Sequence, residues 1–129
     1  MSRVIGRGWA TVDLDRATGE LADLLQPGTS FEEAPRSVLL GARCLRGRAR
    51  LDGDAATEWI VLLEPDTEGR LAAFLARSGE GWAATWSNPP AGWANRPGTP
   101  GPLGEERLSG RIGAAGPFPL LLSAATIDP

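Results

Sequence analysis

Few side chains in this sequence are suited to chemistry, and the most reactive of them is a single thiol. Cys44 lies between Arg43 and Arg46, whose positive charges could lower the pKa of the thiol and favour the nucleophilic thiolate. The sequence has no histidine, lysine or tyrosine, so a histidine base, a Schiff-base lysine and a Walker lysine are all absent. Because Cys44 lies in a strand-like run and free cysteines are usually buried, the sequence favours a structural role over a nucleophilic one.

Four arginines form the second group with chemical potential: Arg43, Arg46, Arg48 and Arg50. Guanidinium groups bind phosphate and carboxylate through paired hydrogen bonds, so this cluster is a candidate anion site. The alternative, which we favour, is that these arginines lie on the solvent side of a strand. The formal net charge of -3 and the pI near 4.9 argue against a nucleic-acid partner.

Carboxylates are the remaining candidates. Asp13, Glu58 and Glu64 could bind a metal ion through oxygen alone, but solvated charges at the ends of strands are the simpler interpretation. Two carboxylates of unknown separation do not indicate an acid–base pair. Without histidine the sequence offers neither a histidine-bound metal nor histidine acid–base catalysis, and we expect no cofactor.

The composition indicates one globular domain. The 129 residues are 42% hydrophobic and 22% charged, with a mean hydropathy of -0.14. A single cysteine excludes an intrachain disulfide, and no apolar run reaches the roughly 20 residues that cross a bilayer. Residues 1–8 contain no apolar signal segment, so we expect a cytoplasmic protein without a membrane partner.

Periodicity and turn residues predict the elements that position these side chains. Asp15 is the expected N-cap of a first helix, and Gly79 is the expected left-handed residue that ends a second one. The predicted strands lie over 4–14, 57–64, 82–86, 106–112 and 117–124, and residues 37–51 form one long strand or two short ones broken near Gly41 or Gly47. Helices are predicted over 16–25 and 67–78, loops over 26–36 and 88–102, and a hairpin turn over 52–56.

The order of these elements suggests a duplication. Gly8-Trp9-Ala10 is expected to open the first strand, and Gly81-Trp82-Ala83 the strand after the central helix. A strand, a connector and several further strands occur twice in the same order. The sequence therefore indicates a duplicated module rich in β-strands.

Three segments of the central region carry a resemblance to a known family: Leu-Leu-Glu-Pro at 62–65, Gly-Arg-Leu-Ala-Ala-Phe-Leu-Ala-Arg at 69–77 and Gly-Glu-Gly at 79–81. They resemble a strand, the inter-module helix and the start of the second module in epimerase-like members of the vicinal oxygen chelate superfamily. This superfamily also includes glyoxalase-like, bleomycin-resistance-like and dioxygenase proteins. Asp-Leu-Asp-Arg-Ala at 13–17 is similar as well, and the resemblance extends over residues 8–86.

The resemblance implies an α+β fold in which two βαβββ-like modules form half-barrel sheets around a cleft. Module one would span residues 4–64, the inter-module helix 66–79 and module two 81–125. The helix of the second module is replaced by the Pro/Gly-rich loop, where proline and glycine preclude a regular helix.

Catalytic members of the superfamily hold a divalent metal with about four side chains, typically His or Glu. The resemblance places these positions at Val61, at Ala83 or Ala84, within residues 119–122 and within residues 6–9. None of them is a His or a carboxylate, and apolar side chains supply no metal donor. We therefore expect no metal.

Tryptophan is expected to replace the metal ligands. If Val61 and Ala84 face the cleft, strand alternation puts Trp59, Trp82 and Trp86 on the same face. Such walls suit a flat aromatic or hydrophobic molecule, since each aromatic pair adds about 0.5–1.5 kcal/mol beyond area burial. The alternative is that the indoles have collapsed into the cavity as core. With Trp9 in one of two registers and Trp93 as a lid, the candidate ligand-binding residues are Trp9, Arg43, Trp59, Val61, Trp82, Ala84, Trp86 and Trp93.

The leading hypothesis is a non-catalytic, metal-independent protein of the bleomycin-resistance-like type that binds a small hydrophobic or aromatic molecule. Its acidic balance would tolerate a cationic drug. A second hypothesis is an interaction or regulatory module with a filled cleft, or a homodimer. The third is a divergent lyase, isomerase or dioxygenase-like enzyme that uses Arg43, Glu64 or Cys44.

Overall fold

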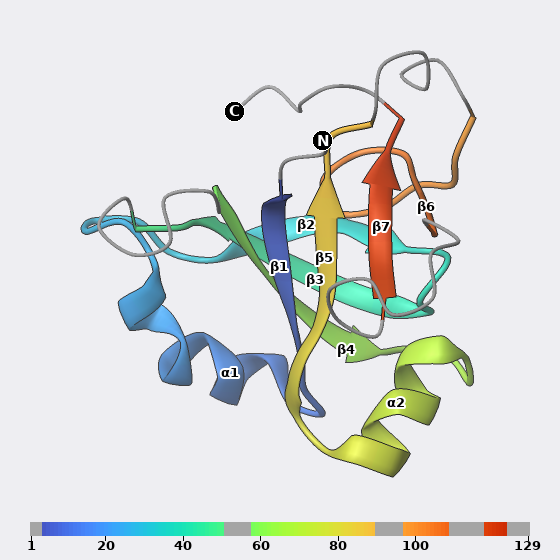
Figure 1. Ribbon diagram of the computed structural model, residues 1–129. Helices are drawn as coiled ribbons and strands as arrows, with labels where there is room; N and C mark the ends of the chain where they lie inside the picture. The colour runs from blue at the N-terminus through green and yellow to red at the C-terminus, as the bar shows by residue number, and fades with distance from the viewer. Residues whose placement is uncertain (1–3, 51–57, 90–96, 109–117, 124–129) are drawn as a thin grey trace.

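The computed structural model describes residues 4–50, 58–89, 97–108 and 118–123, and within them one seven-stranded sheet with order β2-β3-β4-β1-β5-β7-β6 (Figure 1). The strands are β1 (Val4–Ala10), β2 (Glu32–Ser37), β3 (Ala42–Arg48), β4 (Trp59–Pro65), β5 (Gly81–Ser87), β6 (Glu106–Leu108) and β7 (Phe118–Leu122). The helices are α1 (Leu14–Glu20), the short 3-10 helix η1 (Ala22–Leu24) and α2 (Arg70–Ser78).

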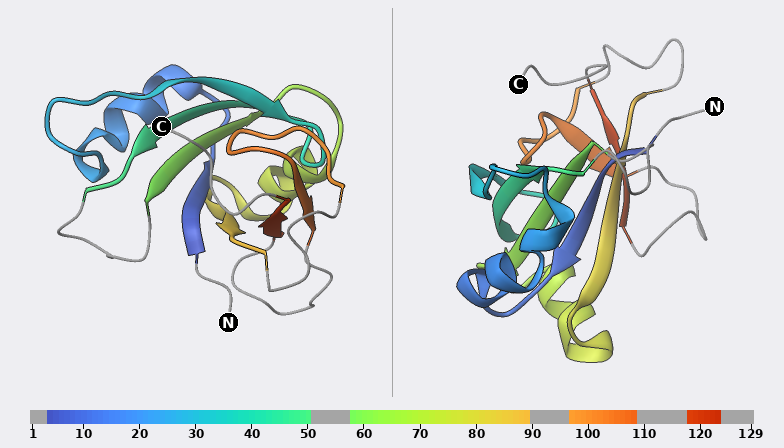
Figure 2. Two further views of the ribbon diagram at one scale, coloured as in Figure 1. Left: turned by 90° about the horizontal axis from the view of Figure 1, so that it is seen from above. Right: turned by 90° about the vertical axis from the view of Figure 1, so that its left-hand side faces the viewer.

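The two halves of the sheet repeat one arrangement. β1 pairs with β4 in parallel and β4 with β3 in antiparallel, while β5 pairs with β7 in parallel and β7 with β6 in antiparallel. β1 and β5 join the halves as an antiparallel pair at the centre. The sheet curls strongly, with α1 on its outer side (Figure 2). The predicted α+β fold with a half-barrel sheet is therefore confirmed.

Helix α1 begins earlier and ends earlier than the sequence predicted. Its N-cap is Asp13 and not Asp15, because the Asp13 side chain accepts a hydrogen bond from the backbone N–H of Arg16 at 3.1 Å. After Glu20 the chain tightens into η1, whose hydrogen bonds span three residues. Leu25 is consequently buried while Leu24 is 37% exposed, and the helix predicted over residues 16–25 is not continuous.

Strand β2 occupies part of the segment that was predicted as a loop. It is an edge strand that pairs only with β3, and it contains two glutamates, an arginine and Pro35. An edge strand tolerates proline and charge because one side of its backbone needs no partner. Its sequence therefore lacks the hydrophobic alternation from which strands are predicted.

Helix α2 confirms the predicted central helix. It ends at Gly79, whose φ of 76° is left-handed, and it buries Leu71 and Phe74 against the sheet. Asp66, which precedes the helix, accepts two hydrogen bonds from Arg36, at 2.8 and 2.6 Å. The predicted turn over 52–56 lies outside the described residues. None of the described helices is long and apolar enough to cross a membrane.

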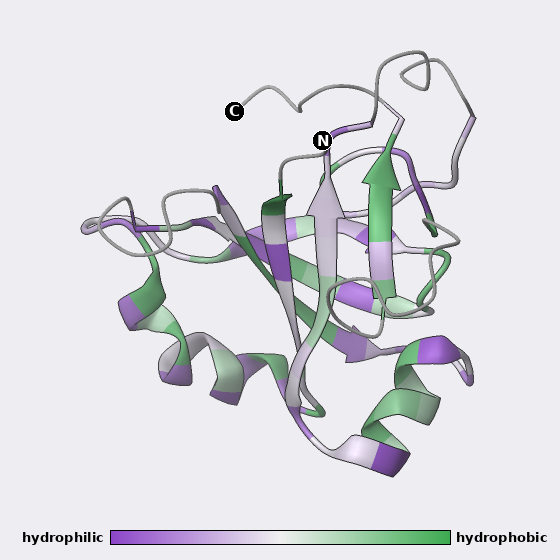
Figure 3. Cartoon of the chain, in the orientation of Figure 1, coloured by the Kyte–Doolittle hydropathy of each residue, from purple (hydrophilic) through white to green (hydrophobic). Residues whose placement is uncertain are grey.

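The sheet buries side chains on both faces. We call the face covered by α1 the outer face and the opposite one the inner face. On the outer face Leu14 and Ala17 of α1 pack against Leu62 of β4. The inner face holds the largest cluster, to which β4, β5, β7 and α2 all contribute. Both helices alternate hydrophobic and hydrophilic residues, whereas β7 is largely hydrophobic (Figure 3).

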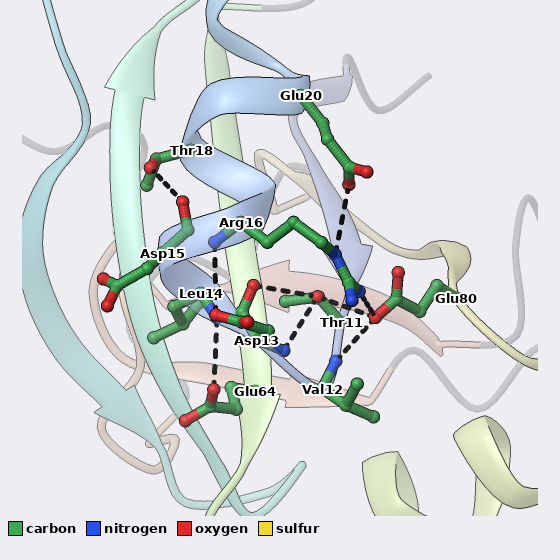
Figure 4. Close-up of polar contacts among 10 residues, drawn as sticks. All are labelled: Thr11, Val12, Asp13, Leu14, Asp15, Arg16, Thr18, Glu20, Glu64 and Glu80. Carbon is green, nitrogen blue, oxygen red and sulfur yellow. Dashed lines mark hydrogen bonds and ion pairs between the residues drawn. The ribbon is translucent and has the colours of Figure 1, made fainter.

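A polar cluster ties α1 to the start of β5 (Figure 4). The Glu80 carboxylate accepts hydrogen bonds from the Val12 backbone N–H and the Thr11 hydroxyl, each at 2.9 Å. It also forms an ion pair with Arg16 of α1. These hydrogen bonds, first that from Val12, lower the pKa of Glu80.

We expect Glu80→Gln to lower the melting temperature at neutral pH. The folded-state pKa of Glu80 is depressed. Its contribution to the free energy of unfolding is therefore full above the ordinary pKa of 4.5 and is lost as pH falls through the depressed pKa. The difference between wild type and variant should therefore shrink in acid. Thermal melts from neutral to acid pH measure it, with exposed Glu68→Gln as the control; equal melting temperatures at neutral pH would contradict the role of Glu80.

Candidate functional site

One row of neighbouring residues crosses the inner face of the four central strands. Gly8 of β1 lies beside Val61 of β4 on one side and Ala84 of β5 on the other, and Ala84 lies beside Phe118 of β7. Residues directly opposite on neighbouring strands present their side chains to the same face. Three of the positions at which the sequence resemblance placed metal ligands thus meet in this row, at Gly8, Val61 and Ala84, whereas Phe118 precedes the range predicted on the last strand.

The side chains of this row cannot hold a metal ion. Gly8 has no side chain and the other three are hydrocarbon, whereas a divalent ion needs nitrogen, oxygen or sulfur donors at about 2.0–2.5 Å. Over the described ranges, His, Cys, Asp and Glu form no group of three or more that could hold a metal. The metal of catalytic superfamily members therefore does not fit these strands.

The next row carries two tryptophans. Gly6 of β1 lies between Trp59 of β4 and Trp86 of β5, and both indoles belong to the inner-face cluster. The Trp86 ring also covers Gly8, because a Cβ there would lie 2.8 Å from its Cζ3 atom. Trp86 is completely buried and Trp59 is 8% exposed. These indoles share a face with Val61 and Ala84, as strand alternation predicts.

Trp82 lies on the outer face, so the prediction that it joins Trp59 and Trp86 is wrong. Its ring meets that of Trp9 edge to face, with centroids 5.2 Å apart, and the Arg7 guanidinium lies 4.2 Å from its centroid. Both tryptophans pack against outer-face clusters. Trp9 therefore takes the register that points away from the predicted cleft, and Trp93 lies outside the described residues.

A bulge between β1 and β5 causes this reversal. Gly8 pairs with Ala84, but the next residue, Trp9, pairs with Trp82, so Ala83 is an extra residue in β5. An extra residue shifts the alternation of side chains by one position. The repeated Gly-Trp-Ala segments therefore lie opposite each other, and the first of them ends β1 rather than opening it.

A buried carboxyl, which the sequence analysis missed, contacts Trp86. The Trp86 Nε1–H donates to Oε1 of Glu106 at 2.7 Å, and the Ser37 hydroxyl donates to Oε2 at 2.6 Å. Glu106 is completely buried, and burial raises its pKa. Ser37 is distant in sequence from Glu106, so no spacing pattern could have revealed the pair; glycine at 101, where a Cβ would collide with the carboxyl, is the only local sign.

The Ser37–Glu106 hydrogen bond closes the curled sheet. Ser37 ends β2 and Glu106 begins β6, and these are the two edge strands of the sheet. The segment 97–105 lies between them, and Thr99 exchanges backbone hydrogen bonds with Glu106 at 2.9 and 2.8 Å. The Val38 N–H also donates to the Pro100 carbonyl at 3.1 Å. The inner face is therefore covered by the chain itself.

Leu103 occupies the place where the tryptophan-walled cleft was predicted. Its side chain is completely buried, and its Cδ1 atom lies 2.6 Å from the position that a Cβ on Gly6 would take. Gly6 is the residue flanked by Trp59 and Trp86, so Leu103 covers the space between the two indoles. Arg46 holds this segment by donating from Nη1 to the Pro102 carbonyl at 2.6 Å.

The arginine cluster divides between the two faces. Arg43 lies beside Glu64 and ion-pairs with Glu33 and Glu64 at 3.7 and 3.8 Å, away from the tryptophans of the inner face. Arg46 and Arg48 lie on the inner face, with guanidinium carbons 5.3 and 4.5 Å from the centroid of the Trp59 ring. The structure therefore brings Arg46 and Arg48, but not Arg43, to the predicted ligand site.

The other candidate residues, Cys44 and the three carboxylates Asp13, Glu58 and Glu64, have contacts that stabilise the fold. The Cys44 thiol is buried, and burial raises its pKa to about 12, so it is protonated at neutral pH. Asp13 caps α1, and Glu64 accepts a hydrogen bond from the Leu14 backbone N–H at 3.1 Å. Glu58 donates its backbone N–H to the carbonyl of Ile5.

This topology defines the class: the chain has the vicinal oxygen chelate fold. The solved structures that it resembles include methylmalonyl-CoA epimerases. That from Mycobacterium tuberculosis is 24% identical, with 67% of this chain and 54% of that chain covered and a TM-score of 0.52. Two Streptomyces coelicolor variants, each in complex with 2-nitronate-propionyl-CoA, are 21% and 20% identical, with TM-scores of 0.53 and 0.69.

The extent of these matches differs. The two Streptomyces coelicolor matches cover 69% and 100% of this chain, and 63% and 99% of the other chains. Thus the chain spans less than two thirds of the length of the first epimerases it matches. No protein-family model matches the sequence, and no curated protein matches it. At these identities the likeness shows a shared fold and not a shared activity.

We expect Glu106→Gln to remove a pH dependence of stability. The folded-state pKa of Glu106 is raised. Its contribution to the free energy of unfolding is therefore full below the ordinary pKa of 4.5 and is lost as pH rises through the raised pKa. Relative to wild type, the amide variant should therefore gain stability as pH rises. Glu106→Leu should instead cost about 1–3 kcal/mol for each buried donor left unpaired.

Urea unfolding at several pH values measures both effects, and Glu105→Gln, a change at the adjacent exposed residue, is the control. Parallel stability curves for wild type and Glu106→Gln would show that the carboxyl is not the buried group described here.

Proposed function

We propose that this chain is a metal-independent protein that binds a small hydrophobic or aromatic molecule on the inner face of its sheet. The observation that carries the proposal is the replacement of metal-donor positions by Gly8, Val61 and Ala84, with Trp59 and Trp86 on the next row. Small-molecule sites are concave and mostly apolar, with a few placed polar groups. Here those groups would be Glu106 and the two inner-face arginines.

The fold supports the part of this proposal that concerns small-molecule binding. The Streptomyces coelicolor epimerase structures are complexes with 2-nitronate-propionyl-CoA, so proteins that share this fold bind a small molecule. Two buried groups of this chain are poorly suited to catalysis: burial raises the pKa of the Cys44 thiol to about 12, and the Glu106 carboxyl accepts hydrogen bonds from two donors. We therefore propose binding without catalysis.

The ligand would take the place of Leu103. In the closed structure this side chain covers Gly6 between the indoles, so a molecule stacking there must displace it. Segment 97–105 belongs to neither a helix nor a strand, apart from the bridge between Thr99 and Glu106. Its displacement would leave the central strands of the sheet intact.

The test is a titration of tryptophan fluorescence and melting temperature with a panel of neutral, anionic and cationic aromatic compounds. We expect Leu103→Ala to tighten binding by about tenfold, because the ligand no longer has to displace the leucine side chain before it binds. The same change should lower stability by about 2–5 kcal/mol, as for other buried leucines. A failure of every compound to quench fluorescence or raise the melting temperature, in wild type and variant alike, would refute the proposal.

Matched tryptophan variants locate the site. Trp59→Phe should weaken binding by about threefold to tenfold, since it removes part of the stacking surface. Trp82→Phe, which alters an indole on the outer face, should leave the affinity unchanged. Equal effects of the two substitutions would place the ligand elsewhere.

Complete burial of Val61, Trp86 and Leu103 favours a second candidate function. In this second function the chain is an interaction module or forms a homodimer, its inner face is filled, and it binds no small molecule. Sedimentation of the purified protein together with the titration separates the candidates, because only this second function predicts an assembly whose stability no compound changes.

A further inference from the structure

The inner face carries two guanidinium groups beside one wall of the proposed site. Arg46 and Arg48 alternate along β3, and they lie opposite Val61 and Trp59 of β4. Their guanidinium carbons lie 5.3 and 4.5 Å from the centroid of the Trp59 ring. Both arginines are partly exposed, whereas Trp59 is buried. The pair therefore marks the rim at which the apolar wall meets solvent.

Within the described part of the chain one carboxylate faces this pair: Glu32 of β2 lies opposite Arg46 of β3, too far away for an ion pair. Arg46 gives one hydrogen bond, to the Pro102 carbonyl, and Arg48 contacts the Trp59 ring; neither forms an ion pair with a described residue. Arg43 on the same strand differs, because Glu33 and Glu64 pair with it. A guanidinium has five N–H donors, so both inner-face arginines retain donors for a ligand.

The buried carboxyl of Glu106 has partners of its own. It accepts hydrogen bonds from Trp86 and Ser37, and burial raises its pKa. Beside the Trp59 ring the described charged side chains are therefore two arginines and Glu32, whereas the whole chain carries a formal net charge of -3. A cationic ligand, which the overall composition would tolerate, is disfavoured there.

We propose that Arg46 and Arg48 form an anion subsite at the rim of the inner face. The ligand would then be a hydrophobic or aromatic organic anion that ends in a carboxylate or phosphate. This inference rests on the proposed function, since the apolar part of the ligand would lie against Trp59. An arginine stacked on an aromatic ring is held in orientation, and it pairs with carboxylate or phosphate through two parallel hydrogen bonds.

Four naphthyl compounds test the proposal by differing only in their polar group: naphthylacetate, naphthyl phosphate, the neutral naphthylacetamide and the cationic naphthylmethylammonium. At low salt we expect the two anions to bind about tenfold tighter than the amide, as one good ion pair allows, and the cation to bind weakest. The advantage of the anions should shrink as salt is added. The carboxylate and the phosphate arms identify which anion the subsite prefers.

Arg48→Gln is the decisive variant, because Arg48 makes no hydrogen bond to the chain that the substitution would break within the described residues. It should lower the affinity for the anions about tenfold and leave that for the amide unchanged, while Arg48→Lys should restore part of the loss. Arg43→Gln, on the opposite face of the same strand, is the matched control and should change neither.

The outcomes separate this inference from the function on which it rests. If the amide binds as tightly as the anions, or the cation more tightly, or if Arg48→Gln weakens all compounds equally, the anion subsite is wrong while small-molecule binding stands. If none of the four compounds binds to wild type or to Leu103→Ala, the proposed function fails and the subsite with it.

Discussion

The carboxyl of Glu106 is the contact on which the rest of the inner face depends. It receives hydrogen bonds from Trp86 of β5 and from Ser37 at the end of β2, so a single side chain joins the centre of the sheet to both of its edges. An unpaired buried polar group costs about 1–3 kcal/mol, which makes the three residues mutually dependent. The orientation of the Trp86 indole over Gly8, and the position of segment 97–105, follow from this closure.

Two glutamates of this chain show how surroundings decide charge. Glu80 accepts backbone and side-chain hydrogen bonds at a partly exposed position, and these bonds favour its ionised form. Glu106 also accepts two hydrogen bonds, but its burial outweighs them and favours the neutral form. The same type of side chain therefore has opposite pKa shifts at two positions of one chain.

Local patterns predicted the parts of the fold that local interactions determine. The leucine and phenylalanine spacing of α2 and the left-handed Gly79 are readable within one segment, and both are confirmed. The apolar run of β4 is similarly explicit. Strand β2 was missed because an edge strand carries no hydrophobic alternation, and its pairing with β3 is visible only in three dimensions.

The candidate site was predictable in composition and less so in geometry. Trp59 and Trp86 share a face with Val61 and Ala84 because period-two alternation holds along β4 and over most of β5. The bulge at Ala83 breaks that alternation, so Trp82 lies on the outer face. The residue types of this segment do not indicate a bulge. Glu106 and Leu103 reach the inner face through contacts with distant residues, which periodicity does not describe.

Closure between the two edge strands also bears on how the protein is made. Ser37 belongs to the first third of the chain and Glu106 to its last quarter, so their hydrogen bond requires the ordering of a long intervening stretch. Before the residues after β5 are synthesised, a sheet formed by β1 to β5 would leave Trp59 and Trp86 uncovered. A sheet formed at that stage would present an open aromatic surface, which the finished molecule covers with residues synthesised later, among them Leu103.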